Sequence, residues 1–201
     1  MPQHSIILDS PTKRIKLVPP SSSDDAASAA CRVHPTTRRF LQFLPEHMST
    51  DEARIRREGR AEDKRIVDFN VHYTQNDGNI IFGGFCGFFN IDENHNSCEG
   101  GIIVAPELHG TGVATEAIYV LLRYIFENRN IHRTTFETGA DNLPMQRWLE
   151  TVAGARLESQ RKDAWRALDG NYSDVKGYAI LETEWRGHIK AQLENRLARF
   201  I

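Results

Sequence analysis

Short segments in which apolar and polar residues alternate fill much of the first half of the chain. Residues 15–17 and 65–73 follow this pattern. Because the side chains of a strand point alternately to its two faces, each segment predicts a half-buried strand. An Asp-Gly turn then leads into residues 79–91, which are apolar on both faces and predict a central strand paired as a hairpin. Residues 98–105 predict one more strand, which must end by Pro106, so the order predicts an antiparallel meander.

Two helices are predicted before the longer strands. A Ser-Asp-Asp cluster at residues 23–25 offers an N-cap for a short Ala-rich helix. Residues 49–64 begin with Ser49 or Thr50 as cap, and Glu52 stands in the capping-box position. The many Arg and Glu residues of this second helix indicate a solvated face rather than a binding surface.

After residue 112 the spacing of apolar residues changes to that of a helix. Residues 113–129 predict a long amphipathic helix with one apolar stripe. The following segments predict, in order, a strand, a helix, two strands around a turn and a terminal helix, over residues 132–140, 143–153, 155–168, 175–185 and 187–200. This order predicts a mixed α/β (α+β) fold in which helices pack on a sheet.

Composition narrows the class of protein. A chain of 201 residues is the size of one ordinary domain, so a single domain over residues 1–201 is expected. Lys and Arg number 25 against 27 Asp and Glu, a net charge of -2 that predicts no nucleic-acid or membrane partner. No signal peptide or bilayer-spanning stretch is recognisable, which predicts a cytoplasmic protein. The three cysteines have neither paired nor metal-ligand spacing, so no disulfide framework and no metal is expected.

The turn from strand to helix at residues 106–112 carries the first chemical signal. Gly110 and Gly112 allow backbone N–H groups to converge, and the helix N-terminus adds positive partial charge, which suits a phosphate or pyrophosphate. The same glycines also suit a plain tight turn. A P-loop is excluded because no Gly-Lys-Ser/Thr follows. A dinucleotide-binding fingerprint is excluded because Thr115 holds its third glycine position and several strands come first.

Ten residues across this strand, turn and helix match one known pattern, E-x-G-Y-x-L-x-P-E-Y-R-G-K-G-x-A-T-E-A. They are Glu99, Gly101, Pro106, Glu107, Gly110, Gly112, Ala114, Thr115, Glu116 and Ala117. The segment therefore resembles the GCN5-related N-acetyltransferases (GNAT family), in the branch named for the ribosomal-protein alanine acetyltransferases RimJ and RimL. Residues 39–41, 49–53, 142–147, 178–181 and 184–185 are also similar to the family, so the resemblance covers nearly the whole chain.

The resemblance implies a mostly antiparallel central sheet with splayed central strands and helices packed on both faces. It implies acetyl-CoA as acyl donor, with the backbone of Ile102, Ile103 and Val104 pairing with the pantetheine arm and Asn142 contacting the cofactor from the far side. The amides implied to hold the pyrophosphate are those of His109, Gly110, Thr111, Gly112, Val113, Ala114 and Thr115.

Acetyl transfer to an amine needs a base, because only the neutral amine attacks a thioester. At the family's acidic position stands Glu99, which is the expected catalytic base; Asp92, Glu93 and Asp141 are competitors that suit turns. The developing oxyanion needs a donor, and the resemblance implies the N–H of Val104 for this catalytic role.

Two positions depart from the family pattern. His109 replaces the usual Arg or Gln at the start of the turn, which makes cofactor affinity pH-dependent if the imidazole is charged. Met145 replaces a Ser that protonates the departing thiolate in several relatives. Water or a tyrosine such as Tyr178 then takes that role, or no acid is needed.

These observations predict an acetyl-CoA-dependent N-acetyltransferase that transfers directly to a primary amine, either a small molecule or a protein N-terminus. The acceptor pocket is expected within residues 31–63, and the protein is expected to be a monomer or homodimer. A non-catalytic acyl-CoA-binding sensor of the same fold is the alternative, which His109 and Met145 favour. Transfer of a longer acyl group such as succinyl is a second alternative.

Overall fold

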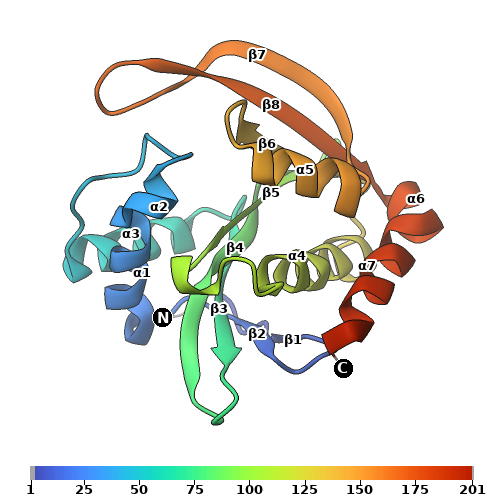
Figure 1. The fold of residues 1–201 in the computed structure, drawn as a ribbon, viewed down its shortest axis with the longest axis horizontal. Coiled ribbons are helices and arrows are strands. Elements are labelled where there is room, and N and C mark those ends of the chain that lie inside the picture. The colour runs from blue at the N-terminus through green and yellow to red at the C-terminus, as the bar shows by residue number, and fades with distance from the viewer. Residues whose placement is uncertain (1–2, 201) are drawn as a thin grey trace.

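The structure of this protein is a computed structural model that describes residues 3–200, and within them the strands form one eight-stranded sheet (Figure 1). The strands are β1 (Leu8–Asp9), β2 (Ile15–Val18), β3 (Val67–Thr74), β4 (Ile80–Asp92), β5 (Ser97–Val104), β6 (Arg133–Gly139), β7 (Arg156–Arg166) and β8 (Tyr172–Leu181). Their order in the sheet is β1-β2-β3-β4-β5-β6-β8-β7.

The helices alternate with the strands along the chain. They are α1 (Asp25–Val33), α2 (Pro35–Arg38), α3 (Thr50–Glu62), α4 (Val113–Arg123), α5 (Leu143–Arg147), α6 (Glu182–Glu184) and α7 (Lys190–Leu197). Three of them, α4, α5 and α6, continue directly as π-helical turns over Tyr124–Asn128, Trp148–Val152 and Trp185–Ile189. Short 3-10 turns cover Ser22–Asp24, Pro106–Leu108 and Ala198–Phe200.

Antiparallel pairing joins every neighbouring pair of strands except β5 and β6, which run parallel. A parallel pair needs a crossover, and α4 supplies it. The predicted meander, β3 to β5, and the mixed, mostly antiparallel sheet are therefore confirmed, and β2 extends the antiparallel order by one strand.

The parallel pair separates soon after it forms. Only Ser97–Glu99 of β5 pair with Arg133–Thr135 of β6, although β5 continues to Val104 and β6 to Gly139. The splayed central strands implied by the resemblance are thus present, and one edge of β5 is left without a strand partner over its second half.

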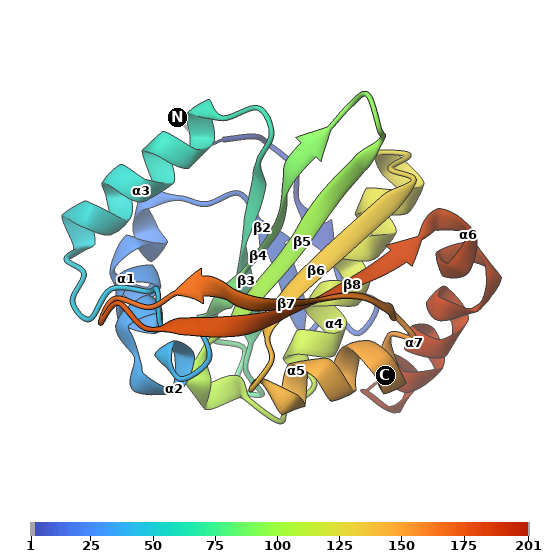
Figure 2. The same cartoon turned by 90° about the horizontal axis from the view of Figure 1, so that it is seen from above.

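Helices cover both faces of the sheet, with α1, α2 and α3 on one side and α4, α5 and α7 on the other (Figures 1 and 2). The alternation of β4 residues sends them to different helices. Phe88 packs toward Tyr124, with ring centroids 6.0 Å apart, on the α4 side. Phe85 lies 4.0 Å below the guanidinium of Arg32 from α1, on the other side.

Some details differ from the sequence-based expectation. Between Val113 and Leu122, only Ala114 of α4 is not buried, because this helix is enclosed between the sheet and α7. Asp24 precedes α1, but its carboxylate makes no cap and instead accepts from Asn70 and His72 of β3. Ser49 and Glu52 form the predicted capping box at the start of α3.

Candidate active site

The separation of β5 and β6 opens a cleft of about 1210 Å³ that runs between the two groups of helices. Its floor is the second half of β5, its far wall is β6 and α5, and its near wall is α1 and α3. The residues of the predicted site and its alternatives that line it are Glu99, Gly101, Ile102, Ile103, Val104, His109, Gly110, Gly112, Ala114, Thr115, Asp141, Asn142 and Met145. The predicted cofactor residues Thr111 and Val113 are not among the lining residues. Residues far apart in the sequence therefore meet in one site.

Backbone groups of β5 face the opening. Ala105 donates its N–H to the Gly83 carbonyl across β4 at 3.0 Å, and Gly84 opposes Val104. Because hydrogen-bonding direction alternates along an antiparallel strand, the N–H and C=O groups of Val104 and Ile102 point away from β4, toward the splay. Ile103 points its backbone groups back toward β4 and lines the cleft with its side chain.

His109 uses part of this edge. Its Nε2 donates to the Val104 carbonyl at 3.0 Å, which fixes the imidazole beside the floor of the cleft. The Val104 N–H on the same side of the strand keeps its direction into the opening.

The glycine turn lies at one end of the cleft, immediately before α4. Gly110 and Gly112 have φ of 78° and 89°, a left-handed conformation that explains glycine at both positions. The N–H groups of His109 and Thr111 are used within the turn, bonded to Pro106 and Leu108. The first residues of α4 have no intrahelical acceptor for their N–H groups, so Val113, Ala114 and Thr115 supply donors at the positive end of the helix.

Below the turn lies a buried ion pair that holds it in place. Glu116 is fully buried, and Arg14, just before β2, donates to its Oε2 at 2.6 Å. Thr12 also donates to this carboxylate, and Arg14 reaches the Thr111 carbonyl at 3.4 Å. Glu116 therefore connects the β1–β2 turn to α4, so the role of this carboxylate is structural.

The C-terminal helical segment returns to the same turn. A Cβ on Gly112 would lie 2.8 Å from the Phe200 ring, and Arg14 stacks on that ring at 4.0 Å. Arg196 and Arg199 also line the cleft, and within residues 3–200 neither is bonded to a carboxylate. The sequence analysis did not find these residues, because only the packing of α7 against α4 brings them to the turn.

Glu99 lies where β5 and β6 begin to separate. Its side chain is half-buried, and Asn90 donates to its Oε2 at 3.0 Å from an irregular position at the end of β4. Burial raises the pKa of Glu99, and the neighbouring Glu137 carboxylate raises it further, while the Asn90 bond acts in the opposite direction. Such a carboxyl accepts a proton more readily than an ordinary glutamate.

Of the competing carboxylates, Asp92 ends β4 and Glu93 lies in the turn that follows it, whereas Asp141 lines the cleft just after β6. Asp92 accepts from the N–H groups of Asn94 and His95 at 2.9 and 3.0 Å, as expected for a turn residue. Glu137, which the sequence analysis did not single out, lines the cleft on β6 and pairs with Arg161 at 2.5 Å.

Asn142 caps α5 and lines the far wall. Its Oδ1 accepts from the Met145 N–H at 3.3 Å. Met145 itself faces the cleft with a thioether, which has no proton to give. Tyr178 cannot replace the missing serine: it is buried outside the cleft and donates to Glu150 at 2.7 Å.

All three cysteines are buried and free. Burial raises the pKa of Cys31 and of Cys98 to about 11, so their thiols stay protonated at neutral pH and are poor nucleophiles. Within residues 3–200 there is no group of three or more His, Cys, Asp or Glu side chains suited to a metal ion. Over the same residues, no helix has the length and apolar character needed to cross a membrane.

Comparison with known proteins agrees with this geometry. The family model described as "Acetyltransferase (GNAT) domain" matches residues 14–154. The chain is 24% identical over 180 residues to "Putative ribosomal N-acetyltransferase YdaF" of Bacillus subtilis, covering 86% of this chain and 93% of that protein. It is 28% identical over 149 residues to "Uncharacterized N-acetyltransferase YnaD" of the same organism, covering 72% and 82%.

Two solved structures share the fold. A GCN5-related N-acetyltransferase from Brucella melitensis superposes with a TM-score of 0.78 at 19% identity, over 96% of this chain and 85% of that chain. A spermidine N-acetyltransferase from Vibrio cholerae, in complex with CoA and spermine, superposes with a TM-score of 0.74 at 24% identity, over 86% and 98%. At these identities the likeness extends to the fold.

Proposed function

Because this chain belongs to the GNAT acetyltransferase family and is therefore an acyltransferase, we propose that it transfers the acetyl group of acetyl-CoA directly to a primary amine. The proposal treats residues 1–201 as one catalytic domain. The observation that carries it is the meeting, in one cleft, of a free strand edge, an anion-binding turn and a carboxyl with raised pKa.

The cleft fits each part of acetyl-CoA. The edge N–H and C=O groups of Ile102 suit an amide of the pantetheine arm, which would add to β5 as a strand does, and Ile103 adds an apolar contact. Val104 offers only its N–H, because its carbonyl accepts from His109. The N–H groups of Gly110 and of Gly112 to Thr115 suit the pyrophosphate. Arg196 and Arg199, which have no carboxylate partner within residues 3–200, add positive charge there. Asn142 would contact the cofactor from the opposite wall.

Acetyl-CoA supplies an acetyl group as a thioester, so a C–N bond forms to the amine nitrogen as the C–S bond breaks. Glu99 takes the proton that the amine nitrogen loses, directly or through one water. The Val104 N–H, directed into the splay, donates to the carbonyl oxygen as negative charge develops there. The leaving thiolate takes its proton from water, since neither Met145 nor Tyr178 supplies one.

The names of relatives suggest two kinds of acceptor. The Bacillus subtilis relative is named for ribosomal N-acetylation, which supports a protein N-terminus among the candidates. The Vibrio cholerae structure shares the fold, and its polyamine substrate is a candidate to test rather than an argument. A non-catalytic acyl-CoA sensor is the second candidate, which Met145 in the cleft favours.

The deciding experiment measures thiol release from acetyl-CoA and from succinyl-CoA by the purified chain, with amino acids, peptides, polyamines and aminoglycosides as acceptors. Acceptor-dependent release establishes the enzyme and its acyl donor. Absence of release with every acceptor, while acetyl-CoA still raises the melting temperature, supports the sensor. Absence of both effects contradicts acyl-CoA binding altogether.

A further inference from the structure

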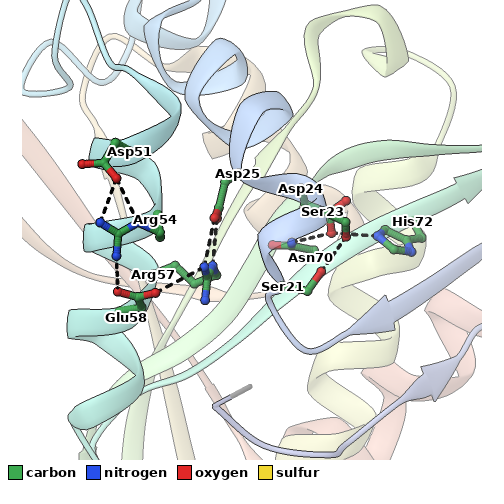
Figure 3. Close-up of polar contacts among 10 residues, drawn as sticks. All are labelled: Ser21, Ser23, Asp24, Asp25, Asp51, Arg54, Arg57, Glu58, Asn70 and His72. Carbon is green, nitrogen blue, oxygen red and sulfur yellow. Dashed lines mark hydrogen bonds and ion pairs between the residues drawn. The ribbon is translucent and has the colours of Figure 1, made fainter. Parts of the chain in front are cut away.

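Arginines of α1 and α3 form the wall of the cleft that faces Glu99. The members of this arginine wall are Arg32, Arg56, Arg57 and Arg60, and all four line the cleft. The sequence suggested a solvated face for α3, but only part of the helix has that role: Arg54 pairs outside the cleft with Asp51 and Glu58 (Figure 3).

Two of the four arginines are already neutralised. Arg57 donates to both carboxylate oxygens of Asp25 at 2.8 and 2.9 Å, and this pair joins α3 to α1 (Figure 3). Arg60 donates to both oxygens of Asp68 on β3 at 2.5 and 2.7 Å. Such bidentate pairs satisfy the guanidinium geometry and leave little capacity for a ligand.

Arg32 and Arg56 have no such partner. Within residues 3–200 neither forms an ion pair or a side-chain hydrogen bond. Arg32 is half-buried, with its guanidinium over the Phe85 ring at 4.0 Å. Burial, together with the like charges of Arg56 and Arg60, lowers the pKa of Arg32 to about 10. The pKa of Arg56 is also lowered, by partial desolvation and by Arg60, although this residue is exposed to solvent at the cleft wall. Both cations thus lie in surroundings that favour a nearby anion.

Strand register places this charge beside the reacting groups. On β4, Phe85 opposes Ile103 and Phe89 opposes Glu99, so both phenylalanines share one sheet face with the proposed base. Arg32 covers Phe85, and Arg60 lies 5.9 Å from the Phe89 ring. The arginine wall therefore stands over the sheet face that carries the side chains of Glu99 and Ile103.

We propose that Arg32 and Arg56 bind an anionic group, a carboxylate or a phosphate, carried by the acceptor, so that the substrate is an acidic primary amine and not a polyamine. This inference rests on the proposed function, because it names the substrate class of that same site. A polycation such as spermidine would meet two unpaired positive charges, whereas an acidic amine brings the missing counter-charge.

The test compares acceptors in matched pairs that differ only in the anion. The pairs are amino acids and their amides, dipeptides with an acidic or a neutral second residue, and amino sugars with or without phosphate; spermidine is the cationic acceptor. The expected result is a kcat/KM at least tenfold higher for the anionic member of one pair. The pair that shows this preference identifies the acceptor as an amino acid, a peptide or a sugar phosphate.

Variants then assign the preference to the arginine wall. In Arg32→Gln and Arg56→Gln the ratio of kcat/KM between the anionic and the neutral member is expected to fall at least tenfold, with the KM for acetyl-CoA unchanged. Arg56→Lys should retain part of the ratio, since the charge remains. Arg54→Gln removes the same charge from the same helix outside the cleft and should leave the ratio unchanged.

Three results overturn the inference: equal kcat/KM within every pair, preference for spermidine, or variants that change the KM for acetyl-CoA but not the acceptor ratio. If no acceptor releases thiol, the proposed catalysis fails, and calorimetry of the CoA-bound protein with the same pairs still decides the inference. Binding of the anionic members that is lost in Arg56→Gln would support it, and no binding would overturn it.

Discussion

At the scale of single residues, the site depends on how one carboxyl is held. Glu99 lies between burial and the Glu137 carboxylate, which raise its pKa, and one hydrogen bond from Asn90, which lowers it. A carboxylate whose pKa is too low stays deprotonated and does not take the proton of the amine. One whose pKa is too high is already protonated when the amine binds. The balance among these three influences should therefore be visible in the pH dependence of the rate.

Replacing Glu99 with Gln removes the base and keeps the size of the side chain. The kcat/KM for the acceptor is expected to fall by about 10²- to 10⁴-fold. In the parent chain the rate rises with pH as Glu99 loses its proton, with a midpoint above the ordinary value of 4.5. That acid limb should be missing in Glu99→Gln, while the Kd for acetyl-CoA is unchanged. An unchanged pH profile would remove Glu99 from the mechanism.

Asn90 is a positioning residue that acts through Glu99. Its φ of 52° is a left-handed conformation that glycine adopts without strain, so Asn90→Gly removes the amide and keeps the backbone. Loss of a hydrogen bond to the carboxylate raises the pKa of Glu99, so the acid limb should move to higher pH with little change in the melting temperature. A lower rate with the limb in place would indicate a purely structural role.

At the scale of elements, the strand, turn and helix that bind the cofactor follow from local sequence. Period-two alternation, the two glycines and the change to helical period are all local signals, and the predicted meander, turn and helix agree with β3, β4, β5 and α4. The family resemblance further implied the splay. Pairing of β5 with β6 over three residues only is a long-range property that alternation by itself does not encode.

Side-chain roles were harder to predict than elements. Tyr178 was an alternative acid in the sequence, but the register of β6 and β8 turns it into the interior toward Glu150. The sequence analysis predicted a solvated face for α3, because the periodicity of charged residues does not show which part of the protein they contact. The sequence did not indicate that the cleft is lined by Arg196, Arg199 and Phe200, because these residues reach it only through the packing of α7 against α4.

Alanine variants of the two turn glycines, Gly110 and Gly112, distinguish the cost of backbone strain from the cost of steric crowding. Alanine at either position must adopt a φ near 80–90°, which costs about 1–2 kcal/mol. A Cβ at Gly110 meets nothing within 4 Å, whereas one at Gly112 meets Phe200 at 2.8 Å. Gly112→Ala should therefore lower the melting temperature more than Gly110→Ala. In a Phe200→Ala background the two losses should become equal; a persistent difference would contradict crowding by this ring.

At the scale of the whole molecule, a slightly acidic chain places in its cleft several arginines that have no carboxylate partner within residues 3–200. The net charge is -2, yet Arg32 and Arg56 line one end of the cleft and Arg196 and Arg199 line the other. Ion pairs elsewhere neutralise most other arginines, so the field that a ligand meets is not the field of the average surface. The cleft therefore suits ligands with anions at both ends, a phosphate-rich donor and an acidic acceptor.

The contribution of Arg196 and Arg199 to acetyl-CoA binding can be tested by measuring the Kd at two salt concentrations. Arg196→Gln combined with Arg199→Gln should raise the Kd for acetyl-CoA roughly 3- to 30-fold at low ionic strength, because two cations that line the cleft are lost. The difference should shrink in about 0.5 M salt, where exposed charges are screened within a few ångström. Arg186→Gln, which breaks an exposed pair with Glu182 away from the cleft, is the matched control. Repeating the titration with 3′-dephospho-CoA shows which phosphate the arginines contact. If the double variant loses affinity for both forms by the same factor, the arginines contact the pyrophosphate. If it loses no affinity for the dephospho form, they contact the 3′-phosphate. An unchanged Kd at low salt would show that the turn amides hold the cofactor without the C-terminal helix.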